Sequence, residues 1–202
     1  VRLAEEDRSV NGNGLQVFGT VTKTPVATGA DLVGYSGFSS SNYLQQPYNS
    51  DLDFGTGDFS ITFWYNQPSQ STEWSYILQR GPEQYLTIRT HPLSSSSLNG
   101  KFLFKFGSAG WSITDYDTRG RGWICATFVR NSGVSKLYVN GVEEYSTPHQ
   151  NATVSYSQEM VIKPVSASIS LFRISATAPS PEQIAKIYND EKHLFQENAQ
   201  AT

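Results

Sequence analysis

The sequence predicts an all-β fold, a sandwich or closed barrel of short strands with one short helix near the C-terminus. The composition is the first observation, because the 202 residues include 11 Tyr, 11 Phe and 4 Trp, and only 16% are charged. Aromatic residues suit the pleated, half-buried surface of a strand. The second is a series of short alternating segments separated by Gly, Pro and Ser turns. The third is a single amphipathic stretch with a helix-start signal.

The first part of the chain, residues 1–31, is weakly patterned, and we expect it to be peripheral to one domain spanning residues 1–202. A chain of this length buries roughly 70% of its unfolded surface, which is enough for one large core. Asn11–Gly14 is a turn signal, since Asn and Gly tolerate positive φ. A strand is expected at Leu15–Val21, and a second, short strand at Tyr43–Gln45 follows a polar loop.

The clearest strand is Phe59–Tyr65, which follows a Gly-rich turn. Its odd-numbered residues are aromatic or aliphatic and point one way, while Ser60, Thr62 and Trp64 point the other way. Alternation is strict in Lys101–Phe106, where three Phe residues share one face. The other expected strands are Ser75–Gln79, Tyr85–Arg89, Trp111–Thr114, Trp123–Arg130, Lys136–Val139, Val142–Tyr145 and Ser168–Ser175.

The pair Asn140-Gly141 is the strongest hairpin signal in the chain. Asn-Gly fits a type I′ turn, whose twist matches that of the strands it joins. Strands Lys136–Val139 and Val142–Tyr145 are therefore expected to pair antiparallel.

One helix is expected over residues 181–192. Ser180 precedes Pro181, and Gln183 follows three residues after the Ser, as in a capping box. Apolar residues at spacings of three and four then form one face. The tail from His193 either continues the helix or frays.

Charge and hydropathy exclude several classes of function. The net charge is −3 without a basic run, which argues against nucleic acid as a partner, because Lys and Arg supply most of that affinity. No apolar stretch approaches the ~20 residues of a membrane span. No signal peptide is visible, and a chain that does not begin with Met is expected to be part of a longer protein. The single cysteine, Cys125, is expected to be a buried small hydrophobe.

The order of four later segments carries a family resemblance. Trp123–Arg130 is followed by Lys136–Gly141, which reads KLYVNG, then by Leu171–Ile174 and the helix start at Ser180. This order resembles the concanavalin A-like lectin/glucanase superfamily, in particular its laminin-G-like and pentraxin-like branch, over residues 40–192. The resemblance implies a two-sheet antiparallel jelly-roll sandwich. That fold hosts lectins, glycosidases, lyases and interaction domains, so it does not fix the function.

Three further segments look like lectin-like modules of bacteriophage tail and fibre proteins. They are Tyr35–Ser39, Tyr48–Phe59 and Leu194–Ala199. This resemblance implies that the chain is a module of a larger virion or extracellular-surface protein.

The sequence offers no clear catalytic set. Sugar-cleaving members of the superfamily carry acidic residues at alternate positions of one strand, and retaining cleavage needs two carboxyls ~5–5.5 Å apart. Here the acids at spacing two are Glu5/Asp7, Asp51/Asp53 and Asp115/Asp117, which we interpret as solvated turn carboxylates. The three histidines, His91, His149 and His193, are scattered, and the chain lacks a serine-hydrolase elbow, a zinc pattern and a phosphate loop.

Aromatic side chains outside the core pattern are the candidates for sugar binding, because Tyr and Trp combine apolar area with a polar group. The predicted ligand-binding residues are Trp74, Tyr76, Trp111, Asp115, Tyr116, Asp117, Arg119 and Arg121. Trp74 follows a polar loop, and a loop at 115–120 is expected between Trp111 and Arg121. The alternative is that Trp111 packs inside the sandwich and that Arg119 pairs locally with Asp117.

Calcium is the candidate cofactor, since lectin-like and laminin-G-like proteins often bind Ca²⁺ through loop oxygens. The densest acidic stretch holds Asp51, Asp53 and Asp58, which are the predicted metal ligands. Neither this stretch nor Asp115/Asp117 aligns with a family metal site residue by residue.

These observations lead to three hypotheses about function. The first is a non-catalytic glycan-binding or adhesion module of a larger phage tail or surface protein. The second is a structural module that self-associates in a fibre through an exposed apolar patch including residues such as Phe38, Tyr43 or Leu194. The third, which the missing carboxylate set disfavours, is a polysaccharide-cleaving enzyme.

Overall fold

The computed structural model describes residues 2–5, 14–70, 73–81, 85–92, 97–148 and 152–200, with side chains from residue 14 onward. Some expectations fall outside these ranges. They are the turn residues Asn11–Asn13, Asp7 of the pair Glu5/Asp7, His149 and part of the loop before Trp74, while Glu5 lies at the end of the first strand.

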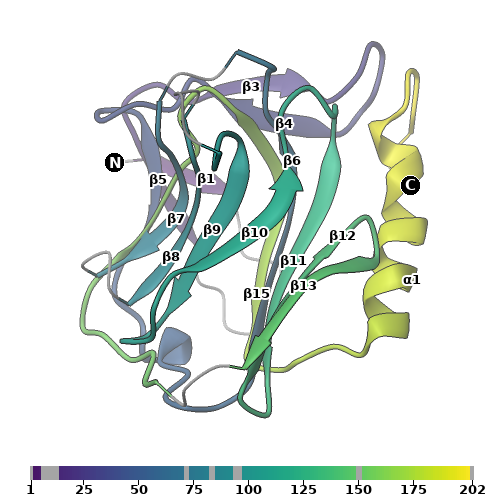
Figure 1. Ribbon diagram of the computed structural model, residues 1–202. Helices are drawn as coiled ribbons and strands as arrows, with labels where there is room; N and C mark the ends of the chain where they lie inside the picture. The colour runs from purple at the N-terminus through teal and green to yellow at the C-terminus, as the bar shows by residue number, and fades with distance from the viewer. Residues whose placement is uncertain are drawn as a thin grey trace.

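The described residues form two packed antiparallel sheets, as the jelly-roll prediction requires (Figure 1). Sheet A has the order β1-β2-β5-β14-β7-β8-β9-β10, and sheet B has the order β13-β12-β11-β6-β15-β4-β3. The strands of sheet A are β1 (Arg2–Glu5), β2 (Leu15–Phe18), β5 (Tyr43–Gln46), β14 (Met160–Lys163), β7 (Ser75–Arg80), β8 (Leu86–Thr90), β9 (Lys101–Phe106) and β10 (Ser112–Asp117). Those of sheet B are β13 (Val142–Pro148), β12 (Val134–Val139), β11 (Ile124–Asn131), β6 (Phe59–Asn66), β15 (Ser168–Ser175), β4 (Val33–Ser36) and β3 (Thr22–Pro25).

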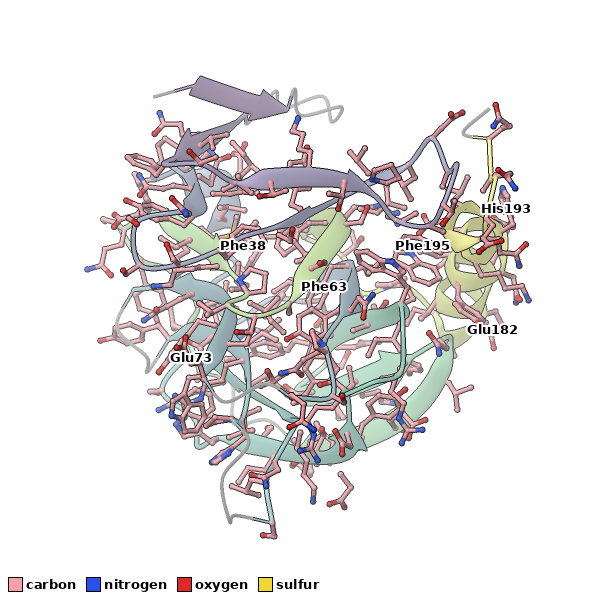
Figure 2. The ribbon with its side chains drawn as sticks, turned by 90° about the horizontal axis from the view of Figure 1, so that it is seen from above. Phe38, Phe63, Glu73, Glu182, His193 and Phe195 are labelled. Atoms are coloured by element: carbon pink, nitrogen blue, oxygen red, sulfur yellow. The ribbon has the colours of Figure 1, made fainter. Side chains whose placement is uncertain are left out.

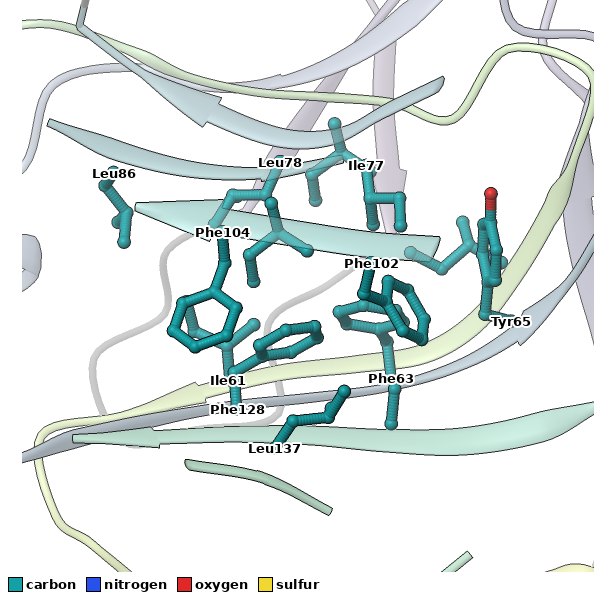
Figure 3. Close-up of a cluster of buried hydrophobic side chains, with 14 of the residues drawn as sticks. Ile61, Phe63, Tyr65, Ile77, Leu78, Leu86, Phe102, Phe104, Phe128 and Leu137 are labelled. Carbon is teal, nitrogen blue, oxygen red and sulfur yellow. The ribbon is translucent and has the colours of Figure 1, made fainter. Parts of the chain in front are cut away.

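Aromatic side chains from both sheets fill the space between them (Figure 3). Phe59, Ile61, Phe63 and Tyr65 on β6 are fully buried, which confirms the predicted inward face of that strand. The three Phe residues of β9 meet them from sheet A, and the Phe104 and Phe128 rings lie 5.3 Å apart in an edge-on arrangement. Alternation along each strand therefore fixes which residues enter the core and which face outward.

A helix covers the outer face of sheet B. Helix α1 (Pro181–Glu191) begins at Ser180 with the predicted capping box, and η2 (Lys192–Phe195) follows it directly. Trp64, on the outward side of β6, stacks on Phe195 at 4.0 Å and donates from Nε1 to Glu191 at 2.8 Å. In Figure 1 no described helix covers the outer face of sheet A.

The predicted hairpin is confirmed. Asn140 and Gly141 have φ values of 52° and 83°, as a type I′ turn requires, and Val139 pairs with Val142. A Cβ on Gly141 would lie 3.0 Å from Ala185 Cα, so a glycine here also allows α1 to approach the hairpin.

Several sequence expectations were wrong in detail. The strand predicted at Leu15–Val21 ends at Phe18, and β3 and β4 follow as separate strands at an edge of sheet B. Strand β14, which lies between β5 and β7, was missed. Phe38, named for an exposed apolar patch, is only 5% exposed and belongs to the core.

Two buried arginines hold the loops at one end of the sandwich. Arg130 on β11 is 1% exposed and donates to the carbonyls of Gly57 at 2.7 Å, Ala152 at 2.8 Å and Gly55 at 2.7 Å. Arg80 on β7 is fully buried and donates to the carbonyls of three loop residues: Leu52, Gln158 and Tyr156. Each guanidinium thus supplies donors to carbonyl groups that have left the sheets.

Replacing Arg130 with Met is expected to lower the free energy of unfolding by about 3 kcal/mol, because three carbonyls lose their donor. Urea unfolding followed by tryptophan fluorescence measures this change. The control is Arg173→Met, which breaks an exposed ion pair with Glu191 and is expected to cost less than about 1 kcal/mol. Equal losses in the two variants would contradict the role assigned to Arg130.

Candidate functional site

The outer face of sheet A presents residues that alternate with the core. On β8, Leu86, Ile88 and Thr90 are fully buried, and Arg89 between them faces the opposite side. Arg89 pairs in register with Tyr76 on β7 and with Leu103 on β9. Arg89 therefore lies on an interior strand of sheet A, on a face that no described helix covers (Figure 1).

The guanidinium of Arg89 lies between two indole rings. Its central carbon is 4.2 Å from the centre of the Trp74 ring and 3.9 Å from that of Trp111. Arg89 Nη1 also donates to the Tyr76 hydroxyl at 3.1 Å. We call these four residues the Arg89 cluster. Cation–π attraction favours this arrangement and orients both indoles relative to the sheet.

The indoles of the Arg89 cluster remain accessible. Trp74 is 37% exposed and Trp111 is half-buried. The His91 ring lies 4.3 Å from the Trp74 ring and adds a polar group at the rim. Figure 2 shows Glu73, which directly precedes Trp74, on the side of the molecule away from α1.

The structure thus brings together three of the predicted binding residues, Trp74, Tyr76 and Trp111, although they come from separate segments. Trp111 does not pack inside the sandwich, which was the alternative interpretation. Sequence reasoning missed Arg89. The signal was present, because Arg89 is the one charged residue of β8 and occupies an outward position in its alternation.

The other predicted binding residues belong to a second, self-paired group. The expected loop at 115–120 was wrong, since Asp115 and Asp117 lie on β10. Arg119 binds Asp117 through Nε at 2.9 Å and Nη2 at 2.7 Å, and Lys101 binds Asp115 at 2.8 Å. The hydrogen bonds from Arg119 hold the pKa of Asp117 below its ordinary value.

Arg121 completes this second group. Its guanidinium lies 5.9 Å from the Tyr116 ring and donates to the Asp117 carbonyl at 3.3 Å. The local pairing of Arg119 with Asp117, which was the alternative interpretation, is confirmed. A ligand at this group would have to compete with these internal contacts.

The predicted metal ligands do not converge. Asp53 accepts hydrogen bonds from Arg80 at 2.7 Å, Tyr156 N at 3.0 Å and the Tyr48 hydroxyl at 3.1 Å. Asp58 accepts from Ser132 N at 2.8 Å, and Asp51 lies in the short helix η1 (Ser50–Leu52). Among the residues with described side chains, no three His, Cys, Asp or Glu side chains form a metal-binding group. These three aspartates therefore do not fit a shared calcium site, and calcium binding stays a prediction.

The side chain of Cys125 is buried and is part of the packing. It is 2% exposed, and burial raises the pKa of its thiol to about 12. A thiol in this state is a packing group, as the sequence predicted, because only the thiolate is a good nucleophile.

Residues 38–185 match the family described as the concanavalin A-like lectin/glucanases superfamily. The chain belongs to this superfamily. The resemblance found in the sequence, and the jelly-roll sandwich that it implied, are therefore confirmed. No curated protein matches the chain in sequence.

Solved structures of toxin binding domains share the fold. The binding domain of Paraclostridial Mosquitocidal Protein 1 is 16% identical, with a TM-score of 0.75, over 92% of this chain and 49% of that one. The binding domain of botulinum neurotoxin serotype D is 17% identical, with a TM-score of 0.73, over 93% of this chain and 49% of that one. A serotype D ligand-binding domain in complex with N-acetylneuraminic acid is 18% identical, with a TM-score of 0.71, over 94% and 50%. The chain thus spans about half the length of the solved domains it matches.

Within the described part of the chain, no helix combines the length and apolar character needed to cross a membrane.

Replacing Arg89 with Met is expected to loosen both indoles and to lower the free energy of unfolding by about 1–2 kcal/mol, because two cation–π contacts are lost. Acrylamide quenching of tryptophan fluorescence should increase, while buried Trp64 supplies a constant background. The control is Lys105→Met, also at an outward position of sheet A, with an expected change below about 0.5 kcal/mol. Unchanged quenching in Arg89→Met would contradict the stacked arrangement.

The Asp53 carboxylate is expected to stabilise the fold in a pH-dependent way. Burial alone would raise the pKa of Asp53, but hydrogen bonds from Arg80, Tyr156 N and Tyr48 outweigh it and hold the pKa below its ordinary value. The stability advantage of the wild type over Asp53→Asn should therefore be full above about pH 5 and should disappear as pH falls through the folded-state pKa. Urea unfolding across the acid range measures it, with the exposed Asp51→Asn as control. A stability difference that does not change with pH would rule out this role.

Proposed function

We propose that the chain is a non-catalytic glycan-binding module that contacts sugar through the Arg89 cluster on the outer face of sheet A. The observation that carries this proposal is a pair of indoles held on either side of one guanidinium on an uncovered sheet face. Pyranose rings have apolar faces that pack on aromatic rings, while their hydroxyls need nearby polar groups. The Arg89 guanidinium, the Tyr76 hydroxyl and the His91 ring are such groups.

The comparisons support a sugar as the ligand. One similar structure is a neurotoxin domain in complex with N-acetylneuraminic acid, and another is from botulinum neurotoxin type C, whose cell entry depends on interaction with two ganglioside molecules. Other similar toxin structures are binding domains. Because this chain spans half of the length of these structures, the transfer of sugar binding to it is part of our proposal.

The ion pairs and lowered pKa values of the acidic residues support a role without catalysis. In the described structure Asp53 is bound to Arg80, while Asp115 and Asp117 are bound to Lys101 and Arg119. A general acid needs a raised pKa, whereas the pKa of each of these three carboxyls lies below its ordinary value.

We further propose that the module belongs to a larger virion or extracellular-surface protein. The segments that resemble phage tail and fibre modules support this setting. Several copies on one particle would strengthen a weak single contact, since linked sites bind at high effective concentration. Self-association in a fibre stays a prediction, and the burial of Phe38 removes one residue of its expected patch. The sequence on either side of residues 1–202 in the parent protein would test this setting.

A glycan array probed with a multimerised form of the chain tests the sugar-binding proposal. The wild type is expected to retain at least one glycan, with or without calcium. Trp74→Ala and Trp111→Ala should each weaken binding about tenfold, since an aromatic contact contributes about 1 kcal/mol or more. The control is Val142→Ala, an exposed apolar residue on sheet B. An array without any bound glycan, or full binding by both Trp variants, would overturn the proposal.

A further inference from the structure

A single row of side chains crosses the outer face of sheet A. Cross-strand pairing places Tyr76 opposite both Lys163 and Arg89, and Leu103 opposite both Arg89 and Ile113. On the other side of β14, Phe18 pairs with Tyr43, and Lys163 is the residue after Ile162, which pairs with Leu44. We call this set the aromatic row, and its members in sheet order are Phe18, Tyr43, Lys163, Tyr76, Arg89, Leu103 and Ile113.

The row has a second aromatic group at its far end. The Phe18 and Tyr43 rings stack with centres 4.7 Å apart and an angle of 9° between their planes. Their neighbours Val17 and Leu44 pack toward the core, so alternation turns Phe18 and Tyr43 outward. Both rings are half-buried and leave part of their surface accessible.

Positive charge lies between the two aromatic groups. Lys163 occupies the position next to Tyr76, and it makes no ion pair with any residue that the structure describes. The row contains two basic residues, Lys163 and Arg89, and no acidic residue. A ligand that lies along the row would meet positive charge at its middle, which favours an acidic group there.

Polar side chains border the row on one side. In the next register position Gln16 on β2 pairs with Gln45 on β5, and Gln79 on β7 lies opposite Val161, so three partly exposed Gln side chains follow the row. Gln carboxamides both donate and accept hydrogen bonds, as sugar hydroxyls do. The aromatic row therefore has a polar border suited to a polyhydroxylated chain.

The length of the row exceeds one sugar ring. Three strand spacings separate Tyr43 on β5 from Arg89 on β8, which is roughly 14 Å at about 4.8 Å per spacing. We propose that the aromatic row binds a linear acidic oligosaccharide that lies across the strands. Its end units pack on the Phe18–Tyr43 pair and on the Arg89 cluster, and a carboxylate or sulfate group contacts Lys163. This inference rests on the proposed sugar-binding function and adds the charge and the length of the ligand.

The experiment uses five acidic polysaccharides, namely polygalacturonate, alginate, hyaluronan, heparin and polysialic acid. Each is compared with its neutral counterpart, made by carboxyl reduction and, for heparin, also by desulfation. The chain is expected to bind at least one acidic polymer and to lose that binding on the neutral form. Affinity for oligomers of the bound polymer should rise from the monosaccharide to the tetrasaccharide.

Variants along the row separate this inference from the general proposal. Lys163→Gln is expected to weaken binding of the acidic polymer about tenfold, whereas Lys23→Gln, the same charge change on sheet B, should leave it unchanged. Tyr43→Ala should weaken the tetrasaccharide but not the disaccharide, and its thermal unfolding reports whether the fold is retained.

Three outcomes overturn the inference while sparing the proposed function. One is binding that depends on Trp74 and Trp111 but not on Lys163 or on acidic groups. Another is a monosaccharide that binds as tightly as the tetrasaccharide. If the chain retains none of these polymers but retains a glycan on the array, the inference alone fails. If the array also shows no bound glycan, the proposed function fails together with the inference.

Discussion

The packing of one face of sheet A against sheet B determines where every functional side chain of this protein can lie. The core accepts the alternate residues of each strand, such as Leu86 and Ile88 on β8 and the Phe residues of β9. The residues between them must face outward, because the side-chain period of a strand is two. Arg89 and its register partners Tyr76 and Leu103 are therefore arranged by the same alternation that fills the core.

The outer face of sheet B is covered by helix, whereas no described helix covers the outer face of sheet A. Helix α1 and η2 cover sheet B, where Trp64 is buried beneath Tyr188 and Phe195. The two buried arginines hold the loops at one end of the sandwich. Arg130 donates to the carbonyls of the Gly-rich turn before β6, and Arg80 donates to the carbonyl of Tyr156 in the loop beside it. The acidic residue Asp53 is used in that network, which explains why a dense acidic stretch need not be a metal site. The outer face of sheet A is then the surface on which partly exposed aromatic rings gather.

Local patterns predicted much of the fold. Strict alternation identified β6 and β9, the Asn-Gly pair identified the hairpin, and the capping box identified the start of α1. The missed strands β1, β3, β4 and β14 are four residues each and are defined by their partners more than by their own pattern. Strand β10 extends to Asp117 for the same reason, because pairing with Lys101 keeps polar residues in an extended conformation.

The sequence predicted the aromatic residues of the candidate site but not that they meet at Arg89. Trp and Tyr residues outside the core pattern could be named from the sequence, and three of them meet at Arg89. Their meeting depends on the register of β7, β8, β9 and β10, which no short segment encodes. The charged residues from Asp115 to Arg121 were equally plausible from the sequence, and only the structure reveals that they bind one another.

The crystal structure of this chain with its tightest-binding glycan tests the central claim most directly. Sugar rings packed against Trp74 and Trp111 on the outer face of sheet A are the predicted result. Sugar bound at the loops around Asp51 and Asp58, or at Asp117 and Arg119, with the Arg89 cluster in contact with solvent alone, would contradict it.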